Sequence, residues 1–197
     1  MKRKQKWKAA ACVLALSAIL AACGDKELAV DTNTLYMKSD GTVTEASFEL
    51  FEESYYDAAE LEEYVKEEVR AYNYKNVKEA IAVDKVEVQD KVAAVYLTYQ
   101  TAEDYIAFNE AELFAGTVKK AMDAGYDFDT EFVSYEKGEE ARLLEVTETG
   151  ANRILILDAT IDVRVDGTIL FVSSNVQKKD KKNVSLTQGG LSYIIYK

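Results

Sequence analysis

Apolar and polar residues alternate along several short segments that end at turn residues, which is the pattern of half-buried β-strands. Turn sequences at 39–41, 89–91 and 166–167 separate such segments, and the first and last contain Asp-Gly, a strong hairpin signal. We therefore expect three strand pairs. They span 35–38 with 42–51, 81–88 with 92–99, and 153–165 with 168–176, and further strands are expected at 128–135 and 184–196.

Two longer segments repeat their apolar residues at helical spacing. The first, 58–74, follows the capping residue Asp57, and the second, 102–124, ends before Gly125. Gly inside a helix costs up to about 1 kcal/mol relative to Ala, so the second segment is expected to break into two helices at Gly116. The residues expected on the buried face of the first helix are Leu61, Tyr64, Val65, Val69 and Tyr72.

The Asp166-Gly167 turn predicts a specific register, because a two-residue loop sets the pairing of the strands that it joins. The expected pairs on one face are Val165 with Thr168, Val163 with Leu170 and Ile161 with Val172, and the other face carries Asp162, Arg164, Ile169 and Phe171. The order of the elements predicts an α+β domain. A mainly antiparallel sheet packs against two or three helices in this prediction, and the C-terminal half is mostly β.

The first 23 residues follow a different pattern. Five cations precede an apolar run at 9–20, which is typical of a secretory signal peptide. The run is shorter than the ~20 residues that a membrane-spanning helix needs. It closes at Leu20-Ala21-Ala22-Cys23, which resembles the lipobox of bacterial lipoproteins. The resemblance implies cleavage before Cys23 and a thioether-linked diacylglycerol on Cys23.

The chain is thereby expected to have three parts: a signal peptide at 1–22, a lipidated N-terminus with a short tether at 23–33, and a single ectodomain at 34–197. The protein is expected at the cell membrane, held on its extracytoplasmic face by the lipid on Cys23, because two acyl chains anchor stably. Cys12 would leave with the signal peptide, so no disulfide within the mature chain is expected. The ectodomain resembles uncharacterised small lipoproteins of Gram-positive bacteria, and this resemblance supplies neither an activity nor site residues.

Composition excludes several classes of chemistry. The chain contains no His, which rules out histidine-based catalytic triads, histidine general bases and His/Cys zinc sites. Loss of the five signal-peptide cations changes the formal charge from −11 to −16. A domain this acidic repels nucleic acid and anionic lipid headgroups, and nucleic acid is therefore not expected as a partner. No catalytic residue, cofactor-binding motif or metal-ligand set is identified, and Cys23 is the single predicted site residue.

Three groups of side chains carry candidate chemistry. Four carboxylates in a turn could bind Ca²⁺ weakly, although they depart from the EF-hand pattern and a solvated acidic turn is the simpler interpretation. Four lysines form a solvated loop or a patch that faces the membrane or an acidic partner. Tyrosines suit either a recognition surface or a core with hydroxyl groups at its rim. These groups are Asp123, Asp127, Asp129 and Glu131; Lys178, Lys179, Lys181 and Lys182; and Tyr55, Tyr56, Tyr72, Tyr74, Tyr96, Tyr99 and Tyr105.

The expected function is therefore that of a membrane-anchored, non-enzymatic binding or interaction module, whose partner is a cell-envelope protein or a small ligand. One alternative is a small-ligand or Ca²⁺-binding lipoprotein. Another is a glycan hydrolase that uses paired carboxylates. A deep pocket with two facing carboxylates would favour the hydrolase, whereas a broad exposed Tyr and Phe surface would favour interaction.

Overall fold

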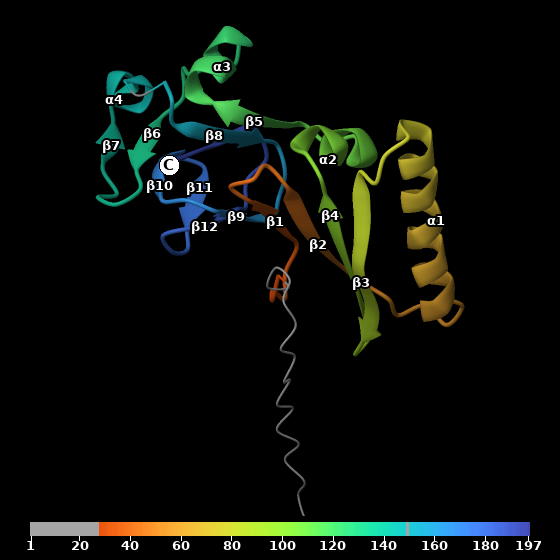
Figure 1. Cartoon of the computed structure of the whole chain (residues 1–197). Helices are drawn as coiled ribbons and strands as arrows, with labels where there is room; N and C mark the ends of the chain where they lie inside the picture. Colours follow the sequence, from red (N-terminus) through yellow and green to blue (C-terminus); the bar gives the residue numbers. More distant parts are fainter. Residues whose placement is uncertain (1–27, 149) are drawn as a thin grey trace, which may run out of the picture.

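The computed structural model describes residues 28–148 and 150–197, which form two packed β-sheets with helices on their faces (Figure 1). Sheet A has the strand order β11-β12-β9-β1-β2-β4-β3, and sheet B has the order β5-β8-β13-β10-β6-β7. The strands of sheet A are β1 (Thr34–Met37), β2 (Val43–Leu50), β3 (Ile81–Gln89), β4 (Val92–Tyr99), β9 (Asp162–Val165), β11 (Val176–Lys178) and β12 (Asn183–Leu186).

Sheet B and the helices complete the fold. The strands of sheet B are β5 (Leu113–Thr117), β6 (Phe132–Ser134), β7 (Glu140–Ala141), β8 (Arg153–Leu157), β10 (Ile169–Ser173) and β13 (Ser192–Tyr196). The helices are α1 (Ala58–Asn76), α2 (Ala102–Asn109), α3 (Val118–Asp123) and α4 (Leu143–Thr147). The predicted α+β class is confirmed. Among the described strands the pairing is antiparallel except between β1 and β9, and the C-terminal half is mostly strands.

The first two predicted hairpins are confirmed. The pair β1–β2 surrounds the predicted Asp-Gly turn, and β3–β4 closes through a two-residue loop at Asp90 and Lys91. Both loop residues have positive φ, 50° and 64°, which is the requirement of a type I′ turn. The register of β3 against β4 shifts between Val83 and Lys85, so β3 carries a bulge on the edge of sheet A.

The hairpin predicted at Asp166 and Gly167 is wrong. The strands on either side belong to different sheets, because β9 pairs with β1 and β12 while β10 pairs with β13 and β6. Thr168 exchanges backbone hydrogen bonds with Lys197 and not with Val165. The alternation of β9 correctly places Val163 in the core, but alternation specifies the face of a strand and not its neighbour.

Two of the predicted long strands are each interrupted, because the chain passes from one sheet to the other within them. The segment 153–165 divides into β8 and β9, and 184–196 divides into β12 and β13, with each half in a different sheet. The helical region predicted at 102–124 is helical only at its two ends, and the prediction is wrong for residues 110–117. Glu110 ends α2 in the left-handed conformation, and β5 then pairs with β8 before α3 begins. Of the strand predicted at 128–135, only β6 is present.

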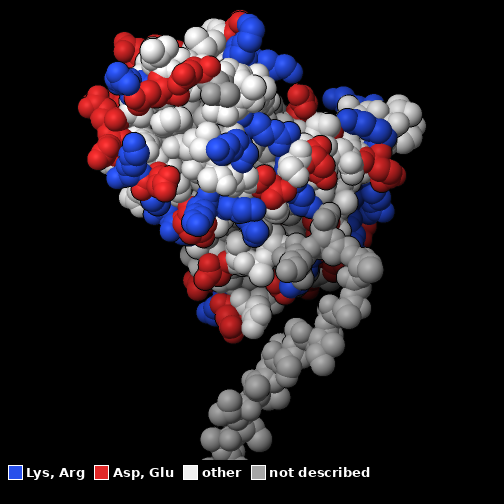
Figure 2. Space-filling model, turned by 60° about the vertical axis from the view of Figure 1, so that its left-hand side comes forward, with Lys and Arg blue, Asp and Glu red and all other residues white. Residues whose placement is uncertain are grey.

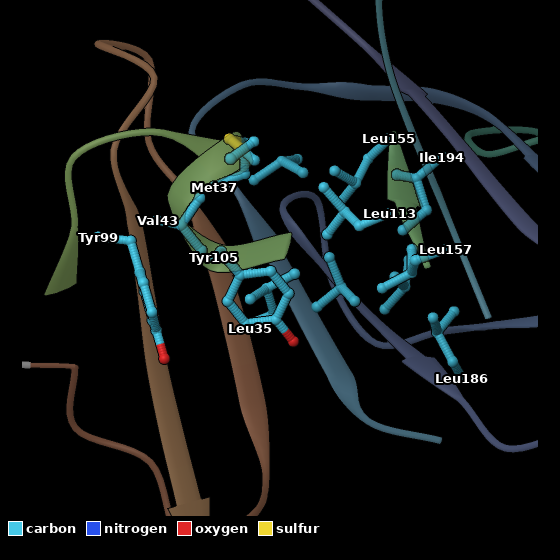
Figure 3. Packing of buried hydrophobic residues seen from close by; sticks show 14 of the residues in the cluster. Leu35, Met37, Val43, Tyr99, Tyr105, Leu113, Leu155, Leu157, Leu186 and Ile194 are labelled. Carbon is cyan, nitrogen blue, oxygen red and sulfur yellow. The ribbon is translucent and has the colours of Figure 1, made fainter. Parts of the chain in front are cut away.

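The main core lies between the two sheets (Figure 3). Leu35 and Val43 of sheet A face Leu155, Leu157 and Ile194 of sheet B across this layer. At the β4–β3 end of sheet A, the face that elsewhere contacts sheet B packs against α1 and α2. A second cluster fills the outer face of sheet B beneath α3 and α4. Within the described part of the chain, no helix has both the length and the apolar character of a membrane span.

Candidate binding groove between two helices

Helix α1 is fixed at both ends by side-chain hydrogen bonds. Asp57 caps its N-terminus, where a carboxylate oxygen accepts from the backbone N–H groups of Ala59 and Glu60 at 2.8 and 3.1 Å. Near the C-terminus, the amide oxygen of Asn73 accepts from Ala80 N and Ile81 N, and its Nδ2 donates to Ile81 O, all within 2.9 Å. The amide of Asn73 therefore ties α1 to the start of β3.

The buried face of α1 is narrower than predicted. Val69 is buried and Val65 and Tyr72 are half-buried, but Tyr64 is 61% exposed, so its predicted burial is wrong. The neighbouring helix α2 has only 8 residues, against 19 in α1, and leaves part of the inner face of α1 uncovered. Helical spacing indicates which side chains share a side of a helix, but it does not indicate how much of that side a neighbour covers.

The uncovered strip forms a groove of about 490 Å³ between α1, α2 and the face of β4. Val95 and Leu97 of β4 form its floor, and the rings of Tyr72 and Phe108 meet edge to face at 5.6 Å in its wall. Two charged side chains of α1 line it as well. The lining residues are Tyr64, Val65, Glu68, Ala71, Tyr72, Lys75, Val95, Leu97, Ala107 and Phe108.

A buried carboxylate anchors Tyr72. Asp104 is only 4% exposed, and it accepts hydrogen bonds from Tyr72 Oη at 3.3 Å, from Lys78 Nζ at 2.9 Å and from Thr101 Oγ1 at 2.9 Å. Burial by itself would raise the pKa of Asp104, but the hydrogen bonds from Lys78 and Thr101 and the charge of Lys78 leave that pKa below its usual value. Burial, followed by the charge of Asp104, raises the pKa of Tyr72. The groove wall is thus held by a charge-assisted network that the sequence pattern did not single out.

Exposed apolar side chains gather around the same helix. Of the ten large apolar side chains that are exposed among the described residues, six lie between residues 50 and 77. Tyr55 and Tyr56 contact each other edge to face at 4.9 Å, and Phe51 packs against Tyr56 at 4.7 Å. The six are Leu50, Tyr55, Tyr56, Tyr64, Tyr74 and Val77. They are spread along the whole of α1, about 28 Å for 19 residues, so they do not make up one contiguous patch.

The predicted tyrosine group therefore divides between surface and core. Tyr96, Tyr99 and Tyr105 are buried, whereas Tyr55, Tyr56 and Tyr74 are exposed. Tyr99 Oη donates to Glu45 Oε2 at 2.7 Å and accepts from Asn109 Nδ2 at 2.9 Å. Burial, reinforced by the charge of Glu45, strongly raises the pKa of Tyr99. The network holds β2, β4 and α2 together and reaches the surface at Asn109, which is exposed.

A second hollow, of about 810 Å³, lies beside the β6–β7 hairpin and α4. Five glutamates line it together with Lys137, Lys178 and Lys181. Glu145 is one of the five, and its hydrogen-bonded ion pair with Arg142 at 2.6 Å lowers its pKa. A glycan hydrolase needs a general acid with a raised pKa. Glu145, whose pKa is lowered, therefore does not fit the role of that general acid.

The four carboxylates of the predicted acidic turn do not converge. Asp123 pairs with Lys119 at 2.8 Å, and Asp127 accepts from the backbone of Asp129 at 2.8 Å. Residues 127–131 precede β6 and lie outside any strand. No group of three or more acidic or cysteine side chains within 28–148 and 150–197 is arranged to hold a metal ion.

Three of the four predicted lysines contact separate partners. Lys178 donates to Tyr135 O at 2.6 Å, Lys179 pairs with Asp162 at 2.5 Å, and Lys182 pairs with Asp166 at 3.4 Å. Figure 2 shows basic and acidic side chains interspersed over the face that it presents. The run of lysines is therefore not a uniform basic patch.

Ser173, on β10, is not among the residues that line the groove. Ser173 is buried, and its hydroxyl donates to Asn175 and accepts from Tyr193 N, so it closes a strand end. Cys23, the predicted lipidation site, lies outside the described residues. Comparison of the chain with protein-family models, curated proteins and solved structures gives no match.

Proposed function

We propose that the protein is a membrane-anchored extracytoplasmic lipoprotein that acts as a non-enzymatic binding module, and that the groove between α1 and α2 is its recognition surface. The lipid on Cys23 provides the anchor in this proposal. The partner is a small ligand or an apolar segment of a cell-envelope protein.

The observation that carries the binding role is the combination of an apolar floor, aromatic walls and a charged rim in one groove. Its volume of about 490 Å³ lies within the range of roughly 300–1,000 Å³ common for ligand pockets. Tyrosine contributes apolar area together with a polar tip, which suits surfaces that bind without catalysing. Glu68 and Lys75 at the same groove favour a ligand that is amphipathic and not purely apolar.

The groove also supports the small-ligand alternative, because both functions would use the same surface. The Ca²⁺ alternative has no comparable support, since the acidic turn is dispersed. The formal charge of −16 expected after signal-peptide removal continues to disfavour nucleic acid.

Filling the groove tests the binding role. The unlipidated chain that begins at residue 24 is titrated with 1-anilinonaphthalene-8-sulfonate, an amphipathic dye whose emission rises in apolar sites. Ala71 and Ala107 are exposed alanines in the groove lining, so Ala71→Trp or Ala107→Trp should occupy its space. The emission rise is expected to disappear in both variants.

The matched control is Ala151→Trp, which adds the same side chain at an exposed position outside the groove. This variant is expected to retain the dye signal. If the groove variants unfold at the original temperature and bind the dye unchanged, the groove is not the recognition surface.

A further inference from the structure

The described chain joins the domain on the side of sheet A opposite to the groove. Leu28 is 4% exposed and packs against Ala46, Ala94 and Tyr96. Successive side chains of a strand point to opposite faces. Along β4, Ala94 and Tyr96 therefore point toward Leu28, while Val95 and Leu97 form the floor of the groove.

The predicted lipid lies very close to this attachment point in sequence. Cys23 precedes Leu28 by five residues, and an extended chain covers at most about 3.5 Å per residue. The two residues can thus be separated by roughly 18 Å at most. A tether this short keeps the surface around Leu28 near the bilayer, whereas the groove is separated from that surface by the thickness of the sheet.

The outer face of sheet A carries Arg164, whose Nε has no hydrogen-bond partner among the described residues. Strand pairing aligns Arg164, Tyr36, Thr44, Thr98 and Ala82 in one row across this face. The guanidinium group of Arg164 lies 4.6 Å from the centre of the Tyr36 ring, and its Nε is buried with no hydrogen-bond partner among the described residues.

The pKa of the nearby Asp180 carboxylate is lowered first by the backbone N–H of Lys182 and also by the charge of Arg164, but Asp180 does not accept a hydrogen bond from Nε of Arg164. Asp180 instead accepts hydrogen bonds from Asn183 and from the backbone of Lys182. Nε itself has no access to solvent, so contact with lipid phosphate is left to the accessible part of the half-buried Arg164 side chain. The net negative charge of the domain opposes such contact at long range, but that repulsion is screened beyond about 8 Å at physiological salt.

We propose that the outer face of sheet A, with the row from Arg164 to Ala82, lies against the bilayer surface, so that the α1–α2 groove opens away from the membrane. This orientation rests on the proposed lipid anchor. It implies that the partner of the groove approaches from the extracytoplasmic side and is not a lipid of the same bilayer.

Two single-cysteine variants of the full, lipidated chain test the orientation. Ala82→Cys places a label on the outer face, and Ala71→Cys places one at the groove, and both alanines are exposed. Cys23 would be blocked by its lipid, so the introduced thiol is the only reactive one. The labelled proteins are reconstituted into phosphatidylglycerol-containing vesicles that carry nitroxide-labelled headgroups.

The label at residue 82 is expected to lose most of its emission to the nitroxide, and the label at residue 71 is expected to keep most of it. Equal quenching, or stronger quenching at residue 71, would overturn the orientation. Vesicle flotation of the same samples reports the anchor separately. Protein that does not float contradicts the anchor and the orientation together, whereas floating protein with equal quenching contradicts the orientation alone.

The contribution of Arg164 is measured in the same system. Arg164→Gln should weaken quenching of the label at residue 82, because the outer face loses its contact with lipid phosphate. Arg70→Gln removes an exposed cation from α1 and should leave the quenching unchanged. An Arg164→Gln variant with undiminished quenching would show that this arginine does not contact the bilayer.

Discussion

Gly167 lies directly against the main chain of Lys197. A Cβ atom at residue 167 would stand 2.6 Å from Lys197 O and 2.9 Å from the ring of Tyr196. The φ angle of Gly167 is not in the left-handed region, so the glycine is required by space and not by backbone conformation. The closeness arises because the chain passes from sheet A to sheet B at this position and runs beside the last strand.

Gly167→Ala is therefore expected to destabilise the domain by about 1–3 kcal/mol, the usual cost of overpacking. Gly189→Ala is the matched control, since nothing lies within 4 Å of its added Cβ and its φ is not positive. The control should be neutral or slightly stabilising. Urea unfolding of both variants measures the difference, and equal midpoints would contradict the close approach to Lys197.

The sequence predicted the features that depend on residues close together in the chain, and it failed for those that depend on distant residues. Local signals were reliable: the Asp57 cap begins α1, and the segments around Asp90 form a hairpin. The sequence did not predict which strands pair. The pairing of β1 with β9 joins residues more than a hundred positions apart, and no local sequence signal indicates it. The run from Ile154 to Leu157, buried at every position, did contain a usable signal. A strand without alternation is covered on both faces, as β8 is.

The candidate groove was harder to predict than the strands. Tyr64 and Val65 both fit the apolar spacing of α1, yet only the packing of α2 decides that Tyr64 remains exposed. Asp104 has the sequence position of a helix-capping residue, and its contacts with Tyr72 and Lys78 arise only when α1 and α2 meet. Contacts between elements distant in sequence therefore make the site, and periodicity within each element does not encode them.

Val163 and Arg164 test which face of β9 is buried. Val163 is 1% exposed in the core between the sheets, so Val163→Asp should cost several kcal/mol by burying an unpaired charge. Arg164→Leu should change stability far less, because Nε of Arg164 makes no hydrogen bond within the described chain. Urea denaturation ranks the two, and a neutral Val163→Asp with a severe Arg164→Leu would invert the face assignment.

Tyr99 should give the domain an alkaline limit of stability. Burial raises the pKa of Tyr99 far above its unfolded value of about 10, so its contribution is fully present below pH 10 and declines as pH rises above it. Tyr99→Phe should cost about 1.5–3 kcal/mol at pH 7, because Glu45 loses a hydrogen bond. Above pH 10 the variant should lose stability less steeply, by about 1.4 kcal/mol per pH unit.

Denaturant titrations at pH 7, 10 and 11 measure this difference. Tyr64→Phe is the control, since Tyr64 is exposed. Parallel pH curves for the Tyr99→Phe variant and the unmodified protein would contradict the buried Tyr99 network.

The lipid anchor can be tested directly at Cys23. Cys23→Ser should remove the protein from the membrane fraction or leave its signal peptide uncleaved, while Cys12→Ser should alter neither. Fractionation with mass spectrometry of the mature N-terminus measures both effects. A correctly processed Cys23→Ser variant that stays in the membrane fraction would show that the thioether is not the anchor.

The parallel pair of β1 and β9 has a consequence for how the protein folds if it is exported as proposed. β1 is a central strand of sheet A, and one of its edges remains unpaired until β9, more than a hundred residues later, is available. Such long sequence separations slow folding, because the entropy of closing a large loop must be lost before the contact is gained. A chain exported from its N-terminus would therefore expose an open apolar strand edge throughout translocation. Its yield should depend on how well the export machinery protects that edge from other chains.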